Sequence, residues 1–298
     1  METLELHPVW PYSFQQTGKR LIHFEKTAYR YQNGMLYRAL RINQKPLVVG
    51  FSWEDGQEPV MKLHVDRDLS DRDRDKLKKT VRQMFTMDVN LAPFYEQMKK
   101  DNRLAPIIEE RRGLHMVLDS DLYECLMKTI IGQQLNVSFA AKLVDRFVKV
   151  AGDTIESQGE QYSVFPSPEQ VAMLQYEDLQ ALQFNRRKAE YIIDISRKVV
   201  EGTLNLESLV RLDDEEFIQK LCALRGVGRW TAECLLLFGM GRQNLLPAAD
   251  IGLRNALQKV YALPAQPSED EVRKTGQAWS PWSSYVTFYL WDYLTETK

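Results

Sequence analysis

The sequence predicts an α+β fold, in which a small antiparallel sheet precedes a mostly α-helical body. Early in the chain, apolar and polar residues alternate around Asn33-Gly34 and again around Asp55-Gly56, which is the pattern of β-hairpins. From about Asp119 the apolar residues recur with a helical period. We therefore expect an N-terminal sheet domain with flanking helices in residues 1–112 and a helical domain in residues 113–298.

Two segments are expected to build the sheet, residues 20–42 and residues 46–65. Asn33 and Gly34 both tolerate the positive φ angles of a type I′ turn, so they predict a tight hairpin. The charge-rich segment that follows, residues 66–85, predicts a helix with a solvated face, and we prefer this to a DNA contact.

The helical body shows its own start and stop signals. Residues 121–150 contain two apolar stripes, interrupted at Gly132-Gln133-Gln134. Ser167 and Asp213 are expected to be N-caps, because each stands just before an amphipathic segment.

Composition limits the class of protein. With 298 residues and 44% hydrophobic content, the chain can bury a substantial core. It has no apolar run near the ~18 residues that span a bilayer and no secretion signal at its start, so we expect a cytoplasmic protein without a membrane. Its three cysteines lack Cys-x-x-Cys spacing, which argues against a zinc or iron–sulfur site. The net charge of −2 argues mildly against nucleic acid, but a local basic or amide-rich face can still bind phosphate.

The segment LRGVGRWTAECLLLFGMGRQNLLPAAD, residues 224–250, carries the functional signal. Gly226 and Gly228 separate two predicted helices and allow a backbone to approach closely. The second helix would then present backbone N–H groups and positive partial charge to a phosphate. A tight corner between helices with no ligand is the alternative.

This segment resembles the helix-hairpin-helix of DNA-binding proteins, here at about residues 215–240. The carboxylate of Asp250, some twenty residues later, is similar to the catalytic aspartate of the glycosylases that combine this hairpin with a Gly-Pro-rich loop. Three further stretches, IIGQQLNVSFAAKL, KAEYIIDISRKVVEG and AWSPWSSYVTFYLW, resemble the 3-methyladenine DNA glycosylase II (alkylbase) family. With the N-terminal sheet, the resemblance covers nearly the whole chain.

The resemblance implies that Asp250 is catalytic. Breaking an N-glycosidic bond builds positive charge on the sugar, and a fixed carboxylate stabilises that charge and can orient or deprotonate water. A positively charged alkylated base leaves without a strong general acid. Asp250 also precedes a predicted helix and could simply be its N-cap, and the two roles are compatible.

Trp230 indicates the subtype that the resemblance implies. Glycosylases of this superfamily that also cut the strand carry a lysine nucleophile at this position, which forms a Schiff base. Tryptophan cannot do so, and hence we expect a monofunctional enzyme that leaves an abasic site. No cysteine follows Cys234, so the four-cysteine iron–sulfur cluster of one branch is not expected.

The resemblance also suggests how DNA and base are held. The base pocket is expected to consist of Trp230, Trp282, Tyr285 and Cys234. The DNA is expected to contact the hairpin at Gly226, Val227, Gly228, Arg229 and Thr231, and a wedge loop made of Gln133, Gln134 and Leu135. Either Gln134 or Leu135 would fill the gap left by the extruded base. The carbonyls of Cys222, Leu224 and Val227 could hold a monovalent cation, Na⁺ or K⁺, and no other cofactor is expected.

The sequence thus favours a monomeric, nucleoid-associated glycosylase that removes alkylated purines from damaged double-stranded DNA by base flipping. Two alternatives stay open. One is a glycosylase for deaminated or oxidised bases, and the other is a non-catalytic DNA-binding protein that kept the hairpin. Asp250 and the aromatic pocket distinguish the last, since a pure binder needs neither.

Overall fold

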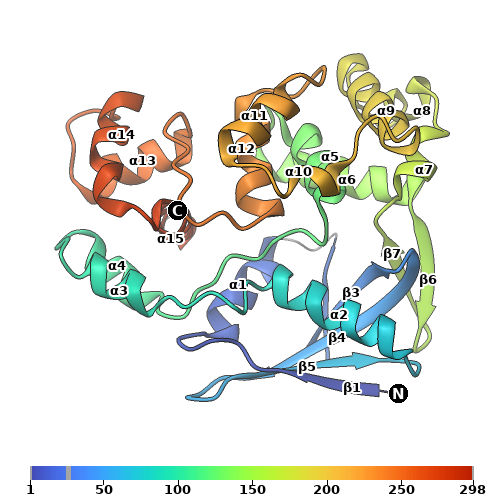
Figure 1. The fold of residues 1–298 in the computed structure, drawn as a ribbon, viewed down its shortest axis with the longest axis horizontal. Helices are drawn as coiled ribbons and strands as arrows, with labels where there is room; N and C mark the ends of the chain where they lie inside the picture. Colours follow the sequence, from blue (N-terminus) through green and yellow to red (C-terminus); the bar gives the residue numbers. More distant parts are fainter. Residues whose placement is uncertain (1, 25–27, 297–298) are drawn as a thin grey trace.

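The computed structural model describes residues 2–24 and 28–296. It confirms the α+β fold, with a sheet at one end of the molecule and helices above it (Figure 1). Among the described residues, five strands form an antiparallel sheet in the order β1-β5-β4-β3-β2. The strands are β1 (Glu2–Leu6), β2 (Arg30–Gln32), β3 (Met35–Ile42), β4 (Lys45–Glu54) and β5 (Val60–Val65).

The Asn33-Gly34 hairpin is present: Gln32 pairs with Met35, and both turn residues have positive φ. The turn between β3 and β4 was not foreseen, since it uses Asn43-Gln44, also at positive φ. The expected hairpin around Asp55 joins β4 to β5 through the longer loop 55–59.

The expectation of strand was wrong for residues 20–24, whereas residues 30–32 and 35–42 of the same segment do form strands. Residues 14–24 form helix α1 (Phe14–Phe24), and residues 25–27 lie outside the described residues. The start of α1 is held by Asp55, whose carboxylate accepts the backbone N–H groups of Phe14 (2.6 Å) and Gln15 (2.8 Å). The backbone N–H of Gln16 also donates to Ser13 Oγ at 3.2 Å, so the sequence carries a local N-cap signal here that we overlooked.

The other helices follow the predicted signals. Ser167 and Asp213 are N-caps, and the charge-rich segment contains the helix α2 (Asp71–Met84), which buries Leu77, Val81 and Met84. The remaining elements are α3 (Ala92–Met98), α4 (Leu104–Glu110), α5 (Leu122–Gly132), α6 (Val137–Ala151), β6 (Asp153–Ser157), β7 (Glu160–Val164), α7 (Pro168–Ala172), α8 (Tyr176–Gln180), α9 (Arg186–Val200), α10 (Leu206–Leu209), α11 (Asp214–Cys222), α12 (Arg229–Cys234), the π-helical turn η1 (Leu235–Gly239), α13 (Ile251–Val260), α14 (Glu269–Gly276), the 3₁₀ turn η2 (Gln277–Trp279) and α15 (Ser283–Glu296).

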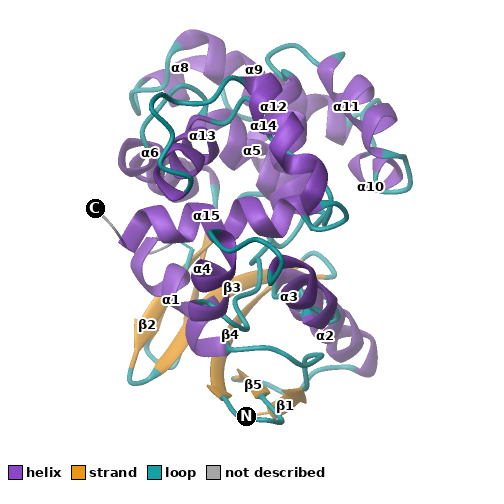
Figure 2. Cartoon of the chain, turned by 90° about the vertical axis from the view of Figure 1, so that its left-hand side faces the viewer, coloured by secondary structure: helices purple, strands orange, loops and turns teal. Residues whose placement is uncertain are grey.

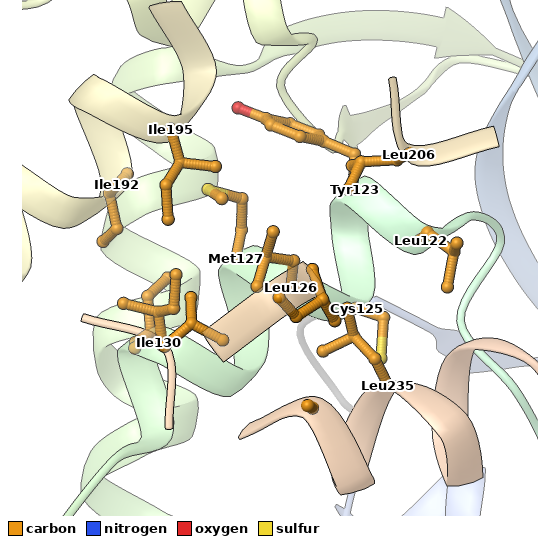
Figure 3. Close-up of a cluster of buried hydrophobic side chains, with 14 of the residues drawn as sticks. Leu122, Tyr123, Cys125, Leu126, Met127, Ile130, Ile192, Ile195, Leu206 and Leu235 are labelled. Atoms are coloured by element: carbon orange, nitrogen blue, oxygen red, sulfur yellow. The ribbon is translucent and has the colours of Figure 1, made fainter. Parts of the chain in front are cut away.

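Three large cores organise these elements. One lies between the sheet, α1 and α2. A second surrounds α5, whose side chains meet those of α9 and η1, as the close-up in Figure 3 shows. The third joins α3 and α4 to α13 and α15. The packing of α3 and α4 therefore crosses the boundary predicted between residues 112 and 113, which stays a prediction.

The sheet also contacts the helical body directly. The hairpin of β6 and β7 packs beside β3 and β4 (Figure 1). There Tyr162 and Val164 meet Ala39 of β3 and Val48 of β4. The cartoon in Figure 2, turned by 90°, shows the strands below and the long α15 above them. None of the described helices is long and apolar enough to cross a bilayer.

Candidate active site and nucleic-acid interface

A pocket of about 190 Å³ lies where two of the helical cores meet. Its walls come from α12, η1, the loop before α13, and α15. The lining residues are Trp230, Glu233, Cys234, Leu237, Phe238, Pro247, Asp250 and Trp291. Trp291 packs against both helical cores, so the pocket sits at their junction. Most of the pocket wall is apolar, and its carboxylates are those of Glu233 and Asp250.

Asp250 combines the two roles considered from sequence. It is the N-cap of α13, where its Oδ1 accepts the backbone N–H of Leu253 at 2.7 Å. The indole Nε1–H of Trp291 donates to the same oxygen at 2.8 Å. Among the described residues, none donates to Oδ2. One oxygen thus fixes the carboxylate, and the other is available to a bound group in the pocket.

Trp291 is the main pocket residue that was not identified from the sequence, because aromatic residues at helical spacing usually belong to the core. Its ring stacks on Phe238, with centroids 5.9 Å apart and planes at 27°. It also lies against the first turn of α13, where a Cβ on Gly252 would come within 3.2 Å of the indole. The glycine at this position lets the ring approach Asp250.

Trp230 and Cys234 line the pocket as expected, one helical turn apart on α12. Trp230 is 44% exposed, which is unusual for a tryptophan and leaves a ring face open to a ligand. Burial, with the charge of Asp250 as the next cause, raises the pKa of Cys234 to about 12. The thiol is therefore protonated at neutral pH and is not a nucleophile.

Trp282 and Tyr285 do not line the pocket, which corrects the sequence-based expectation. Trp282 is 8% exposed and Tyr285 is fully buried, and both rings pack against Phe94 of α3. The backbone N–H of Ser284 donates to the Gln243 carbonyl, and the Ser284 hydroxyl accepts the backbone N–H of Leu245. These bonds fix the turn so that Trp282 faces the core. Neither ring can stack on a ligand at Asp250 in this arrangement.

The helix-hairpin-helix consists of α11, the turn at 223–228 and α12. Gly226 has φ +88°, and a Cβ there would lie 2.2 Å from the ring of Tyr191. The turn is thus pressed against α9 and needs a glycine for both backbone and space. Gly228 is the N-cap of α12 and has open space beside it, so the backbone N–H groups at this helix start are accessible from outside.

The structure changes the roles of some expected DNA contacts. Thr231 is 2% exposed and Val227 is 6% exposed, so their side chains belong to the protein interior. The side-chain Nε2 of Gln133 donates to the Gly226 carbonyl and to Thr231 Oγ1, both at 2.9 Å. The side chain of Gln133 therefore ties the loop after α5 to the hairpin rather than pointing outward.

A buried lysine, Lys188, also holds the loop after α5 in place. The ammonium of Lys188 donates to the carbonyls of Ile131 and Gln133, each at 2.7 Å. In the same loop, Gln134 is exposed with φ +56°, whereas Leu135 is partly buried against the core around α5. Of the two wedge candidates, Gln134 is the one that protrudes.

The remaining predicted contacts have mixed surroundings. Arg229 is about half exposed, but its guanidinium pairs with Glu215 and Glu233. Of the carbonyls proposed for a cation, that of Leu224 accepts the N–H of Val227 and closes the turn, while Cys222 ends α11. A monovalent cation stays a prediction here. Within the described ranges, no cluster of His, Cys, Asp and Glu could hold a metal ion.

A second pocket, of about 380 Å³, lies beside α1 and is the larger of the two. Its carboxylate, Asp55, already accepts hydrogen bonds on both oxygens while capping α1. It therefore has less to offer a reacting group than the pocket at Asp250, whose carboxylate keeps one oxygen available.

Comparisons with known proteins agree with this geometry. Residues 127–281 match the family described as HhH-GPD superfamily base excision DNA repair protein, and residues 15–126 match the 8-oxoguanine DNA glycosylase N-terminal domain. A putative DNA-3-methyladenine glycosylase of Bacillus subtilis is 42% identical over 74% of this chain and 75% of its own length. A second protein of the same organism, a DNA-3-methyladenine glycosylase, is 32% identical over 89% of this chain and 88% of its own length.

Solved structures give the same result. The 3-methyladenine DNA glycosylase from Archaeoglobus fulgidus superposes with a TM-score of 0.84 at 26% identity and covers 98% of both chains. An 8-oxoguanine glycosylase/lyase from Clostridium acetobutylicum shares the fold, with a TM-score of 0.74 at 20% identity over 97% of this chain and 95% of that one. The chain therefore belongs to the 3-methyladenine DNA glycosylase family of the HhH-GPD superfamily, and it is a DNA glycosylase of base excision repair.

Proposed function

We propose that this glycosylase hydrolyses the N-glycosidic bond of alkylated purines, such as 3-methyladenine and 7-methylguanine, in damaged duplex DNA. The observation that carries the proposal is the carboxylate of Asp250, held on one oxygen by Leu253 and Trp291 and open on the other toward a ring-lined pocket. The names of the relatives support the choice of alkylated bases.

The proposed reaction begins with extrusion of the damaged base. The start of α12 and the turn at Gly226–Gly228 would hold a backbone phosphate through N–H groups, which fix the position of the DNA without reading its sequence. Gln134 would enter the stack as the base leaves it. Extrusion costs a few kcal/mol and is easiest for a damaged base, which adds to selectivity.

Inside the pocket, the base would stack between aromatic faces. Trp230 and Trp291 are the rings in place, instead of the Trp282 expected from sequence. An electron-rich ring attracts a cationic base by about 0.5–2 kcal/mol. The sugar would then come next to Asp250, whose carboxylate would stabilise the positive charge developing at C1′ and orient the attacking water.

Trp230 supports hydrolysis without strand cleavage, because an indole cannot form the Schiff base of a lyase. The buried, protonated thiol of Cys234 does not supply another nucleophile. The protein should therefore leave an abasic site that breaks only after alkali. Trapping with borohydride should yield no covalent adduct, and a robust adduct would contradict this part of the proposal.

The deciding experiment is incubation with methylated duplex DNA, followed by chromatography of the released bases. Free 3-methyladenine and 7-methylguanine should appear with the wild-type protein and be absent with Asp250→Asn. Release of only deaminated or oxidised bases from matched duplexes would favour the second class of glycosylase. Binding without release of any base would favour a non-catalytic DNA-binding protein.

A further inference from the structure

Glu233 is a second carboxylate in the pocket. It lies on α12 one turn after Trp230, and its side chain is 12% exposed. It lines the same pocket as Asp250 and Trp291. A carboxylate so far removed from water is costly to bury without a partner, so its place in an otherwise apolar wall requires an explanation.

The partner of Glu233 is Arg229. The Nε–H of Arg229 donates to Oε1 of Glu233 at 3.0 Å, four residues along the same helix. The rest of the guanidinium is turned to Glu215, whose carboxylate it binds at 2.7 Å. Among the described residues, none donates to Oε2 of Glu233. One oxygen is therefore fixed by the arginine, and the other has no hydrogen-bond donor in the part of the chain that the structure describes.

The charges of the pocket wall are all of one sign. Its eight described lining residues include two carboxylates, Glu233 and Asp250, and no lysine, arginine or histidine. Asp250 belongs to the loop before α13 and serves the sugar in the proposed reaction. Glu233 belongs to α12, the element that also carries Trp230, so it is placed to act on the base.

We propose that Glu233 determines specificity, by favouring cationic alkylpurines over neutral damaged bases through its negative charge and through its unpartnered oxygen, which can accept an N–H of the base. The inference rests on the proposed function, since it concerns the base released at Asp250. It assigns charge selectivity to a side chain, where stacking alone would discriminate weakly.

Two opposing influences act on this carboxyl group. Burial, the largest influence, raises the pKa of Glu233 above its ordinary value, while the hydrogen bond and charge of Arg229 and the charge of Arg273 act to lower it. The two arginines thus favour the ionised form that attracts a cation. Because Arg229 is divided between two carboxylates, it does not fully cancel the charge of Glu233.

The test compares release of a cationic base with release of a neutral one. Single-turnover rates are measured on matched duplexes bearing 7-methylguanine or hypoxanthine, with wild type, Glu233→Gln and Glu215→Gln. Glutamine keeps the shape and the oxygen that accepts from Arg229 but removes the charge. The matched control, Glu215→Gln, removes a charge from the same arginine outside the pocket, on a side chain that is 64% exposed.

Glu233→Gln should lower the ratio of 7-methylguanine release to hypoxanthine release by about tenfold, since a nearby opposite charge is lost. Glu215→Gln should lower that ratio far less, because it leaves Arg229 more fully with Glu233 but keeps the charge of Glu233 in the pocket. An equal loss for both bases, or a selective loss of hypoxanthine release, would overturn the inference alone. A wild-type protein that releases no alkylated base would overturn the proposed function, and this inference with it.

A binding measurement covers a variant that no longer catalyses. Quenching of tryptophan fluorescence reports on Trp230 and Trp291 as 7,9-dimethylguaninium, a fixed cation, or neutral 9-methylguanine is added. Wild type should bind the cation more tightly, and Glu233→Gln should lose about tenfold of that preference. An unchanged preference in a folded variant, as judged by circular dichroism, would overturn the inference.

Discussion

Trp282 and Trp291 stand nine residues apart near the end of the chain, and the structure gives them opposite roles. Trp282 is buried against α3 and belongs to a core. Trp291 faces the pocket and donates to the candidate catalytic carboxylate. The comparison teaches that a tryptophan on a turn can be structural while a tryptophan in a helix can serve the site.

Position on the helix does not explain the difference. Val286, Thr287, Phe288, Tyr289 and Leu290 follow one another around α15, and each is at most 4% exposed, so the helix is buried on nearly all sides. The partners of each ring decide its role instead. Trp291 stacks on Phe238 and donates to Asp250, whereas Trp282 precedes the helix and packs against Phe94.

The largest effect should come from the carboxylate that Trp291 contacts. Asp250→Asn should lower base release by about four orders of magnitude, near 5 kcal/mol, as when a catalytic carboxylate is neutralised in other hydrolases. Asparagine is as good an N-cap as aspartate, so the melting temperature should change little. The measurements are single-turnover release and thermal unfolding, with abasic DNA binding as the control. A wild-type rate of base release by the variant would show that Asp250, and with it the pocket beside Trp291, does not carry the chemistry.

The next effect separates the two tryptophans by stability. Trp282→Ala should cost about 3–5 kcal/mol of unfolding free energy, because it empties a well-packed site. Trp291→Ala should cost less, since that ring is only partly buried, but should reduce base release more. Denaturant unfolding and release assays on both variants check this. If the two variants behave alike in both assays, the assignment of one ring to the core and one to the pocket is wrong.

Much of the fold follows from local patterns. Ser167 and Asp213 cap helices where the sequence places them, and Asn33-Gly34 forms its hairpin because these residues accept positive φ. Helix α1 was missed although Ser13 caps it locally. Its other cap, Asp55, is a distant residue, and a long-range hydrogen bond of this kind leaves no signal in the neighbouring residues.

The sequence predicted those residues of the site that lie in one motif, and it missed those that packing brings together. Asp250, Trp230 and Cys234 belong to one continuous motif, and the fold brings them to one pocket. Trp291 comes from another helix, and nothing in the motif distinguished Glu233, so the roles of both residues depend on packing between elements. Thr231 shows the opposite error: it belongs to the hairpin motif and was expected to contact DNA, but its side chain is buried beneath the hairpin.

The core side of the comparison should also show a pH dependence, through His115. This ring is fully buried, stacks on Tyr12 and meets Tyr285 edge-on, and burial lowers its pKa to about 4 from an ordinary 6.5. The folded state thus binds fewer protons than the unfolded state in this range, so stability should fall as the pH drops from 6.5 to 4. The loss should reach about 3 kcal/mol.

Denaturant unfolding at several pH values measures this loss. His115→Gln removes the titrating group, and its stability should therefore depend less on pH between 6.5 and 4 than that of the wild type. The difference between the two curves isolates His115 from carboxylates that titrate nearby. Parallel curves would show that this histidine does not couple the core to pH.

The smallest effect sharpens the comparison most. Trp291→Phe keeps an aromatic face in the pocket but removes the N–H that donates to Asp250 Oδ1 at 2.8 Å. A hydrogen bond to a charged group is worth about 1.5–3 kcal/mol. Part of this should be kept, because the Leu253 N–H still holds the same oxygen. Base release should therefore fall by roughly tenfold, or about 1.4 kcal/mol.

The matched control is Trp282→Phe, which makes the same chemical change in the core and should leave single-turnover release near the wild-type rate. A tenfold loss in both variants would mean that either change acts through packing, and the indole of Trp291 would then have no special part in orienting Asp250.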